Sequence, residues 1–194
     1  MRIIFASNNP NKLKEIKSIM PIDLEVVGLE EAGLFQDIPE PHDSLEENAS
    51  EKSRTIFNLT GESCFSEDTG LEVEALSGAP GVRSARYAGE NADSKRNMEK
   101  LLKQLESREN RKARFRTVIS LIWNGKEYFF EGICNGSISH RPSGERGFGY
   151  DPVFIPDGSD KPFAEMEMTE KNKFSHRKKA TEKLIHFLQQ QCPE

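Results

Sequence analysis

The chain has 194 residues, of which 35% are hydrophobic and 30% charged, and its 32 acidic and 27 basic side chains give a net charge of −5. This length is typical of one domain, so we expect a single domain over residues 1–194. The acidic excess disfavours proteins that coat nucleic acid or bind anionic membranes, because such proteins normally carry a positive excess. We therefore expect no nucleic-acid partner and no membrane partner, although the charge is compatible with a local basic pocket.

The first half of the chain predicts strands that alternate with helices. Residues 2–6 form a short apolar run typical of a buried strand, and a polar break leads to a helix over residues 12–20. Ser44 begins a capping box, so a second helix follows it. Residues 63–66 and 71–75 are predicted as two separate strands on either side of the sequence EDTG.

The second half of the chain predicts an antiparallel hairpin between helices. The further elements are a helix over 94–105, strands over 115–123 and 127–134, a short strand over 152–155 and a helix over about 176–190. The strand over 115–123 is apolar on both faces, and Asn124-Gly125 is a strong hairpin turn that leads to its partner. Because a hairpin is antiparallel, we predict an α/β fold with a mixed sheet and not a purely parallel one.

The three cysteines, Cys64, Cys134 and Cys192, are odd in number and far apart. Without a CxxC pair, neither a zinc knuckle nor a disulfide framework is predicted, and a reducing compartment fits best. The N-terminus lacks the apolar run of a signal peptide, and no stretch approaches ~18 consecutive apolar residues. We therefore expect a cytoplasmic protein.

A polar loop with the sequence SNNPNK joins the first strand to the first helix. Backbone N–H groups at a helix start, short polar side chains and Lys12 one turn into the helix are together suited to hold a phosphate. The alternative is an ordinary N-capped loop with a solvated lysine, and the Walker A pattern is absent.

Two adjacent carboxylates, Glu67 and Asp68, occupy the predicted break between two strands. Mg²⁺ takes oxygen ligands, often one or two carboxylates together with substrate phosphates. Neighbouring residues on a strand point to opposite faces, so a strand lets only one of the two enter a site directly, whereas a turn relaxes this. The alternative is an acidic β-turn, and Glu40 is a further possible ligand.

Two other groups are suited to a nucleotide. In the loop GFGYDP, Phe148 or Tyr150 could stack on a base and Asp151 could accept hydrogen bonds from ring N–H groups; the alternative is a flexible loop with Phe148 in the core. Lys171 and the basic run at 175–179 gather cations at a helix start, where the helix dipole disfavours them unless an anion is shared. The alternative for this run is a solvated basic face. Together the four groups predict metal-dependent cleavage of a nucleoside triphosphate.

These motifs resemble, nearly end to end and in order, the HAM1/RdgB-type inosine triphosphate pyrophosphatases, also known as XTP/dITP diphosphatases. The matching strings are FASNNPNKLKEI, DIPE, ENA, SEDTGLEVEALSGAPGVRSARYAG, NMEKLL, GFGYDPVFIPDG and EKNKFSHRKKA. The resemblance implies an elongated α/β fold with two lobes around a long mixed sheet flanked by helices, an active site in the cleft between the lobes, and a homodimer. It also implies Mg²⁺-dependent hydrolysis of ITP, dITP and XTP to the monophosphate and pyrophosphate, which removes them from the nucleotide pool.

The resemblance further implies roles for individual residues. Asp68 would bind Mg²⁺ and accept the proton of the attacking water, Glu67 would support the metal, and Glu40 would join the metal site. We further expect Lys12, Lys171 and Arg177 to stabilise charge in the transition state. Substrate contacts would come from Ser7, Asn8, Asn9, Pro10, Asn11, Lys12, Thr69, Phe148, Gly149, Tyr150, Asp151, Lys171, His176 and Arg177.

The sequence departs from many relatives at two places, since it has Ser7-Asn8-Asn9 for Thr-Gly-Asn and Glu67-Asp68-Thr69 for Asp-Asp-Ser. Three alternative functions remain open at this point. They are a Maf-like pyrophosphatase of pyrimidine or modified nucleotides, a nucleotide sensor without catalysis, and a nucleic-acid-binding module that uses the C-terminal basic run.

Overall fold

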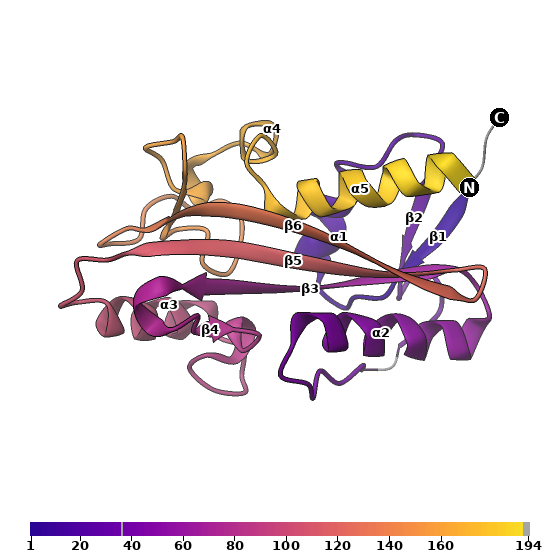
Figure 1. Cartoon of the computed structure of the whole chain (residues 1–194), viewed down its shortest axis with the longest axis horizontal. Helices are drawn as coiled ribbons and strands as arrows, with labels where there is room; N and C mark the ends of the chain where they lie inside the picture. The colour runs from indigo at the N-terminus through magenta and orange to yellow at the C-terminus, as the bar shows by residue number, and fades with distance from the viewer. Residues whose placement is uncertain (36, 192–194) are drawn as a thin grey trace. The chain divides into compact units, whose positions relative to one another are not determined.

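The computed structural model describes residues 1–35 and 37–191 (Figure 1). Cys192, one of the three cysteines considered above, lies outside the described residues. Cys64 and Cys134 are free and buried. Along the described part of the chain, no helix combines the length and apolar character needed to cross a membrane.

One sheet organises the strands, in the order β2-β1-β3-β5-β6-β7 with β4 paired to β3. The strands are β1 (Arg2–Phe5), β2 (Glu25–Gly28), β3 (Cys64–Val73), β4 (Pro80–Gly81), β5 (Lys112–Trp123), β6 (Lys126–Ile138) and β7 (Phe154–Pro156). Strand β1 runs parallel to β2 and β3, whereas β3 with β4 and β6 with β7 are antiparallel. The predicted mixed α/β sheet is therefore confirmed.

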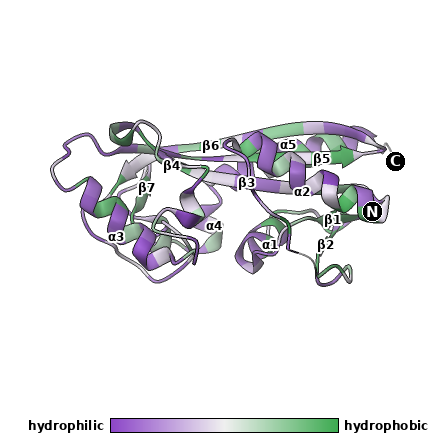
Figure 2. Cartoon of the chain, turned by 90° about the horizontal axis from the view of Figure 1, so that it is seen from below, coloured by the Kyte–Doolittle hydropathy of each residue, from purple (hydrophilic) through white to green (hydrophobic). Residues whose placement is uncertain are grey.

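The predicted helices are confirmed with small shifts of their ends. The helices are α1 (Pro10–Lys17), α2 (Leu45–Thr60), α3 (Ser94–Gln104), α4 (Met168–Lys171) and α5 (His176–Gln191), with 3₁₀ helices η1 (Glu74–Leu76), η2 (Ser84–Arg86) and η3 (Phe163–Glu165). Ser44 caps α2 as predicted, since its Oγ accepts the N–H of Glu47 at 3.2 Å. Helix α3 is amphipathic, with Leu101 buried and Lys95 exposed. In Figure 2 this helix carries both hydrophilic and hydrophobic colours.

The hairpin between β5 and β6 turns at the predicted residues. Asn124 and Gly125 have φ angles of 49° and 75°, which is the left-handed conformation that a two-residue hairpin turn requires. The strand predicted over 115–123 begins earlier, at Lys112, and its partner continues to Ile138. Strands β2 and β4 were not predicted from the sequence.

The prediction of two strands around the acidic pair is wrong, because β3 runs without a break from Cys64 to Val73. Gly70 does not end the strand. Its missing side chain instead admits the backbone of β4, since a Cβ there would lie 2.7 Å from the carbonyl oxygen of Gly81. Glu67 and Asp68 are thus neighbours in a regular strand, and their side chains point to opposite faces of the sheet.

The chain divides into two compact units, each assembled from segments that are far apart in the sequence. Unit 1 comprises Met1–Asp68, Thr117–Gly132 and the segment from Arg177, and unit 2 comprises Thr69–Arg116 and Ile133–His176. Neither unit is one continuous stretch of chain, and a single domain over residues 1–194 stays a prediction.

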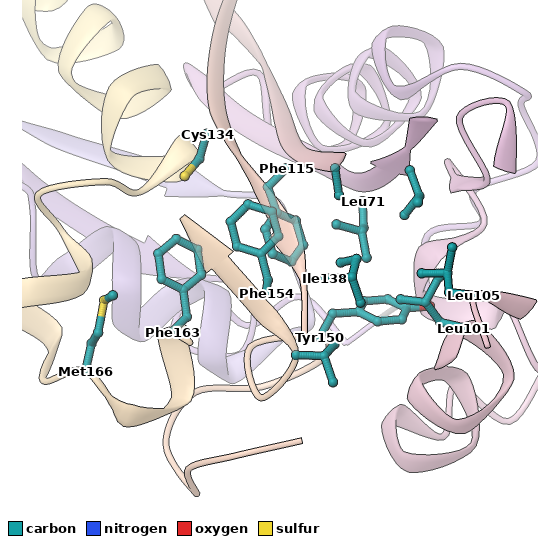
Figure 3. Packing of buried hydrophobic residues seen from close by; sticks show 13 residues of the cluster. Leu71, Leu101, Leu105, Phe115, Cys134, Ile138, Tyr150, Phe154, Phe163 and Met166 are labelled. Atoms are coloured by element: carbon teal, nitrogen blue, oxygen red, sulfur yellow. The ribbon is translucent and has the colours of Figure 1, made fainter. Parts of the chain in front are cut away.

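Each unit has its own core. In unit 1, α5 packs on one face of the sheet, where Leu184 joins Phe5 and Leu121, and α2 packs on the other face, where Ile56 joins Ile4. In unit 2 the core is rich in aromatic side chains, and Figure 3 shows its labelled members. The two faces of β3 in unit 1 therefore meet different helices, and this separates Glu67 from Asp68.

Candidate functional site

On the α5 side of β3, Glu67 forms a buried ion-pair network. Both oxygens of the Glu67 carboxylate accept hydrogen bonds from the Arg177 guanidinium, at 2.8–2.9 Å, and a second carboxylate, Glu15 of α1, also contacts Arg177. The ammonium of Lys12 lies 3.4 Å from Glu67 Oε1. Glu67 is 0% exposed and Arg177 1% exposed. Two carboxylates thus face two cations in a largely buried site, in which the Lys12 side chain stays 14% exposed.

The charges of this network shift the pKa values of its members. Burial raises the pKa of Glu67, but the positive charges of Arg177 and Lys12 outweigh it and lower the pKa from 4.5 to about 2. Burial lowers the pKa of Arg177, but the negative charges of Glu67 and Glu15 raise it by a larger amount, so the net shift of this pKa is upward. Glu67 is therefore ionised at neutral pH, and its oxygens are already bound by a guanidinium.

On the α2 side of β3, Asp68 belongs to a different charged group. Lys52 of α2 lies with its ammonium 3.6 Å from Asp68 Oδ1, and the same ammonium donates a hydrogen bond to Glu40. Asn48 Nδ2 lies 3.4 Å from Asp68 Oδ2. Burial lowers the pKa of Lys52, but the charges of Asp68 and Glu40 raise it more, so the lysine stays charged. Here two carboxylates share one ammonium, and this trio carries a net negative charge.

The carboxylates of this trio fit a hard cation by their chemistry. Asp68 and Glu40 offer oxygen ligands, and Mg²⁺ commonly uses one or two protein carboxylates and completes its shell with water and phosphate oxygens. No group of three or more His, Cys, Asp or Glu side chains among residues 1–35 and 37–191 is gathered to hold a metal by itself. Glu67 lies on the other face of β3, bound to Arg177. Of the three predicted metal ligands, Asp68 and Glu40 therefore lie together beside Lys52, whereas Glu67 lies apart from them beside Arg177.

The N-terminal loop of unit 1 is capped by its own side chains. Asn9 Oδ1 accepts the backbone N–H groups of Asn11 and Lys12, at 3.0 and 3.2 Å, and Pro10 begins α1. Ser7 Oγ accepts the N–H of Asn9 at 3.2 Å. The capped loop expected as the alternative is thus present, but Lys12 is not solvated, because its side chain is only 14% exposed beside Glu67.

In unit 2, Asp151 and Lys171 form a second buried ion pair. Lys171 Nζ lies 2.6 Å from Asp151 Oδ2, and both side chains are 5% exposed. The same Asp151 oxygen accepts the backbone N–H of Phe148 at 2.9 Å, and the Phe148 ring lies 5.5 Å from the Lys171 ammonium. Gly147 has a φ of 74°, and a Cβ there would lie 1.9 Å from Asp151 Oδ2. The glycine therefore lets the loop close on the carboxylate.

The aromatic and histidine side chains predicted to bind substrate in unit 2 differ in how far they are exposed to solvent. Tyr150 is 4% exposed in the core, and its hydroxyl donates to the carbonyl of Ser84 at 2.9 Å, so little of its ring is open to a base. Phe148 is half-buried and is therefore the more open of the two candidate rings. The His176 ring stacks on Phe115, with centroids 4.6 Å apart. The alternative for the basic run at 175–179 was a face exposed to solvent. His176 does not belong to such a face, because it is only 3% exposed.

Thr69 and Gly149 are half-buried, the first in β3 directly after Asp68 and the second in the glycine-rich loop. Substrate contacts at these two residues stay predictions, as they do for the other residues assigned by resemblance.

Sequence reasoning missed two charged residues. Lys52 falls on the apolar face of α2, in step with Leu45, Ala49 and Ile56, and a lysine on such a face is a signal for a buried partner. Glu15 is 4% exposed, but its position in the short helix α1 gives no comparable signal, since its partner Arg177 is 162 residues away.

The long mixed sheet, which carries one acid–base network on each face of β3, defines an α/β protein built around buried charged groups. The chain belongs to the Ham1 family, whose family model matches residues 3–187. A protein of Porphyromonas gingivalis named dITP/XTP pyrophosphatase is 51% identical over 188 residues, covering 96% of this chain and 97% of the relative. A relative from Christiangramia forsetii with the same name is 49% identical, covering 97% of this chain and 99% of the relative. The solved structure of the Staphylococcus aureus Ham1 protein has a TM-score of 0.88 and 39% identity, covering 99% of this chain and all of that one.

Proposed function

We propose that the protein hydrolyses non-standard purine nucleoside triphosphates, namely dITP, ITP and XTP, to the monophosphate and pyrophosphate. Membership of the Ham1 family and the names of its relatives support the reaction. The single observation that supports the choice of base is the Lys171–Asp151 pair, a cationic donor 2.6 Å from an anionic acceptor beside the Phe148 ring.

A 6-oxo purine and adenine present opposite patterns to this pair. A 6-oxo purine offers a carbonyl oxygen next to a ring N–H, so Lys171 can donate to the oxygen while Asp151 accepts from the N–H. Adenine offers an amino group next to a bare ring nitrogen, which sets donor against donor and acceptor against acceptor. A ligand that leaves buried polar groups of the site without hydrogen-bond partners binds much more weakly, so adenine nucleotides should be rejected.

The residues of unit 1 would carry the phosphate chemistry. Asp68, held beside Lys52, would accept the proton of the attacking water, and Lys12 would stabilise the negative charge that develops on the phosphates. Asp68 and Glu40 would hold Mg²⁺, and Glu67 would support this arrangement from the other face of β3 by fixing Lys12 and Arg177. Bound Mg²⁺ would supply charge neutralisation at the phosphate oxygens. Side chains of the loop from Ser7 to Asn11 would bind the phosphates.

The test is pyrophosphate release in Mg²⁺ from dITP, XTP, dATP and dGTP, extended to dTTP and UTP. We expect the wild-type protein to cleave dITP and XTP much faster than dATP, because the Lys171–Asp151 pair mismatches adenine. Guanine, uracil and thymine carry the same carbonyl and N–H pattern, so the slow cleavage expected for dGTP, dTTP and UTP rests on the names of the relatives. Asp68→Asn should lower kcat for dITP by at least ~100-fold, because a positioned base contributes about 10²–10⁴. Asp160→Asn, at an exposed turn, is the matched control. Full activity of Asp68→Asn would remove Asp68 from this role, and equal rates on all nucleotides would contradict the specificity.

The same panel separates the alternative functions. A preference for dTTP or UTP would indicate a Maf-like activity, and nucleotide binding without turnover would indicate a sensor. We further propose a homodimer that works in the cytoplasm, where its nucleotide substrates are found. Light scattering coupled to size exclusion should give twice the chain mass of 22.0 kDa. A mass of one chain at micromolar concentration would contradict the dimer.

A further inference from the structure

We propose that Phe163 is a positioning residue that sets the affinity of the protein for its purine substrates by fixing Lys171 and His176. This inference rests on the proposed function, because it assigns a cause to the binding of the same substrates. Phe163 begins the 3₁₀ helix η3 in unit 2 and is 0% exposed, so it cannot touch a substrate itself.

The ring of Phe163 lies against two basic side chains of unit 2, Lys171 and His176. The Lys171 ammonium lies 5.2 Å from the centroid of this ring, within the ~6 Å range of a cation–π contact. The His176 ring lies 6.4 Å from it, centroid to centroid, and is tilted by 32°. Because the Phe148 ring lies 5.5 Å from the same ammonium, Lys171 is held by aromatic rings as well as by the Asp151 carboxylate.

The backbone of η3 also holds Asp151, the partner of Lys171. The N–H of Ala164 donates to the carbonyl oxygen of Asp151 at 3.1 Å, and the carbonyl oxygen of Ala164 accepts the N–H of Arg146 at 3.0 Å. Gly144 approaches so closely that a Cβ there would lie 2.4 Å from the Ala164 carbonyl. One short turn therefore holds the glycine-rich loop, the acceptor Asp151 and the donor Lys171 together.

The core around Phe163 keeps the ring from turning away. Phe163 packs against Phe154, with centroids 5.2 Å apart, and against Phe115, at 6.2 Å, and Figure 3 shows the three rings in one cluster. Phe115 also stacks on His176 at 4.6 Å. An aliphatic side chain at position 163 would fill much of this space but would present no negative ring face to the ammonium.

The test compares Phe163→Leu with Phe154→Leu. Both replace a ring that is 0% exposed in the same cluster, but the ring contacts of Phe154 are to Phe115 and Phe163. Phe163→Leu should raise KM for dITP and the Kd for inosine monophosphate about tenfold, the scale expected for a desolvated cation–π contact, with kcat within about twofold of wild type. Phe154→Leu should lower the melting temperature similarly but leave KM within about twofold.

Equal changes of KM in the two variants, or a loss of kcat in Phe163→Leu with KM unchanged, would overturn the positioning role. If Phe163→Leu does not fold, the same comparison is made with Phe163→Met, which keeps a large, adaptable apolar side chain. The wild-type protein distinguishes this failure from that of the proposed function. No hydrolysis of dITP by the wild type refutes the function, whereas hydrolysis with an unaltered KM in Phe163→Leu refutes only the present inference.

Discussion

Replacing Glu67 by glutamine removes the carboxylate that faces two cations in the interior of unit 1. The structure gives Glu67 three contacts with Arg177 at 2.8–2.9 Å and one with Lys12 at 3.4 Å. Glutamine has nearly the same shape and keeps one accepting oxygen, so the substitution tests the charge and not the packing. Glu15 still faces Arg177 in the variant, and this limits the loss.

Two routes give the same magnitude for this loss. The fall of the Glu67 pKa from 4.5 to about 2 corresponds to roughly 3–4 kcal/mol, at about 1.4 kcal/mol per unit. Removing one partner of a buried ion pair costs about 3–5 kcal/mol in other proteins. We therefore expect Glu67→Gln to lower the free energy of unfolding by about 3 kcal/mol at pH 7. Because the pKa is lowered in the folded state, this stabilisation is complete above pH 4.5 and is lost as the pH falls toward 2.

Urea unfolding followed by far-ultraviolet circular dichroism, at several pH values between 7 and 3, measures both effects. The difference between wild type and Glu67→Gln should be largest at pH 7 and should narrow below pH 4.5. The control is Glu62→Gln, whose partner Arg2 is an exposed side chain 2.6 Å away, and which should cost under ~1 kcal/mol. Equal losses in the two variants, or a difference that stays constant on acidification, would refute this reasoning.

Two further predictions concern the other networks. Lys52→Met should lower the melting temperature, because it removes the ammonium beside Asp68. Adding MgCl₂ should raise the melting temperature of this variant more than that of the wild type, because a cation can take the place of the ammonium. Equal increases for the two proteins in thermal-shift titrations would contradict this prediction. Gly147→Ala should raise KM for dITP about tenfold, since its Cβ would displace the Asp151 carboxylate that lies 1.9 Å away. Gly158→Ala, also at a positive φ of 88° but with only an ordinary contact at 3.7 Å, should leave KM unchanged, and equal effects in steady-state kinetics would disprove the steric cause.

Much of the fold follows from local patterns in the sequence. The Asn124-Gly125 turn and the Ser44 cap are set by the conformations and hydrogen bonds that these residues favour by themselves, and both were predicted correctly. The strand over 115–123 was also predicted from a local pattern. Its residues are apolar on both faces, and this can be recognised without knowing which strands lie beside it. The motifs by themselves also indicated the Ham1 family, to which the chain belongs.

The tertiary structure alone decided which charged groups meet. Glu67 and Asp68 are adjacent in sequence, yet α5 packs on the face that carries Glu67 and α2 on the face that carries Asp68. The reason is that β3 continues as a regular strand through Gly70, where the local sequence predicts a turn. Arg177 finds its carboxylate 110 residues away, and Lys52 meets Asp68 only because α2 packs on that face of β3. The sequence by itself thus determined the elements and the residue types of this protein. Their pairing into separate networks depended on which surfaces pack together, and no local preference encodes that.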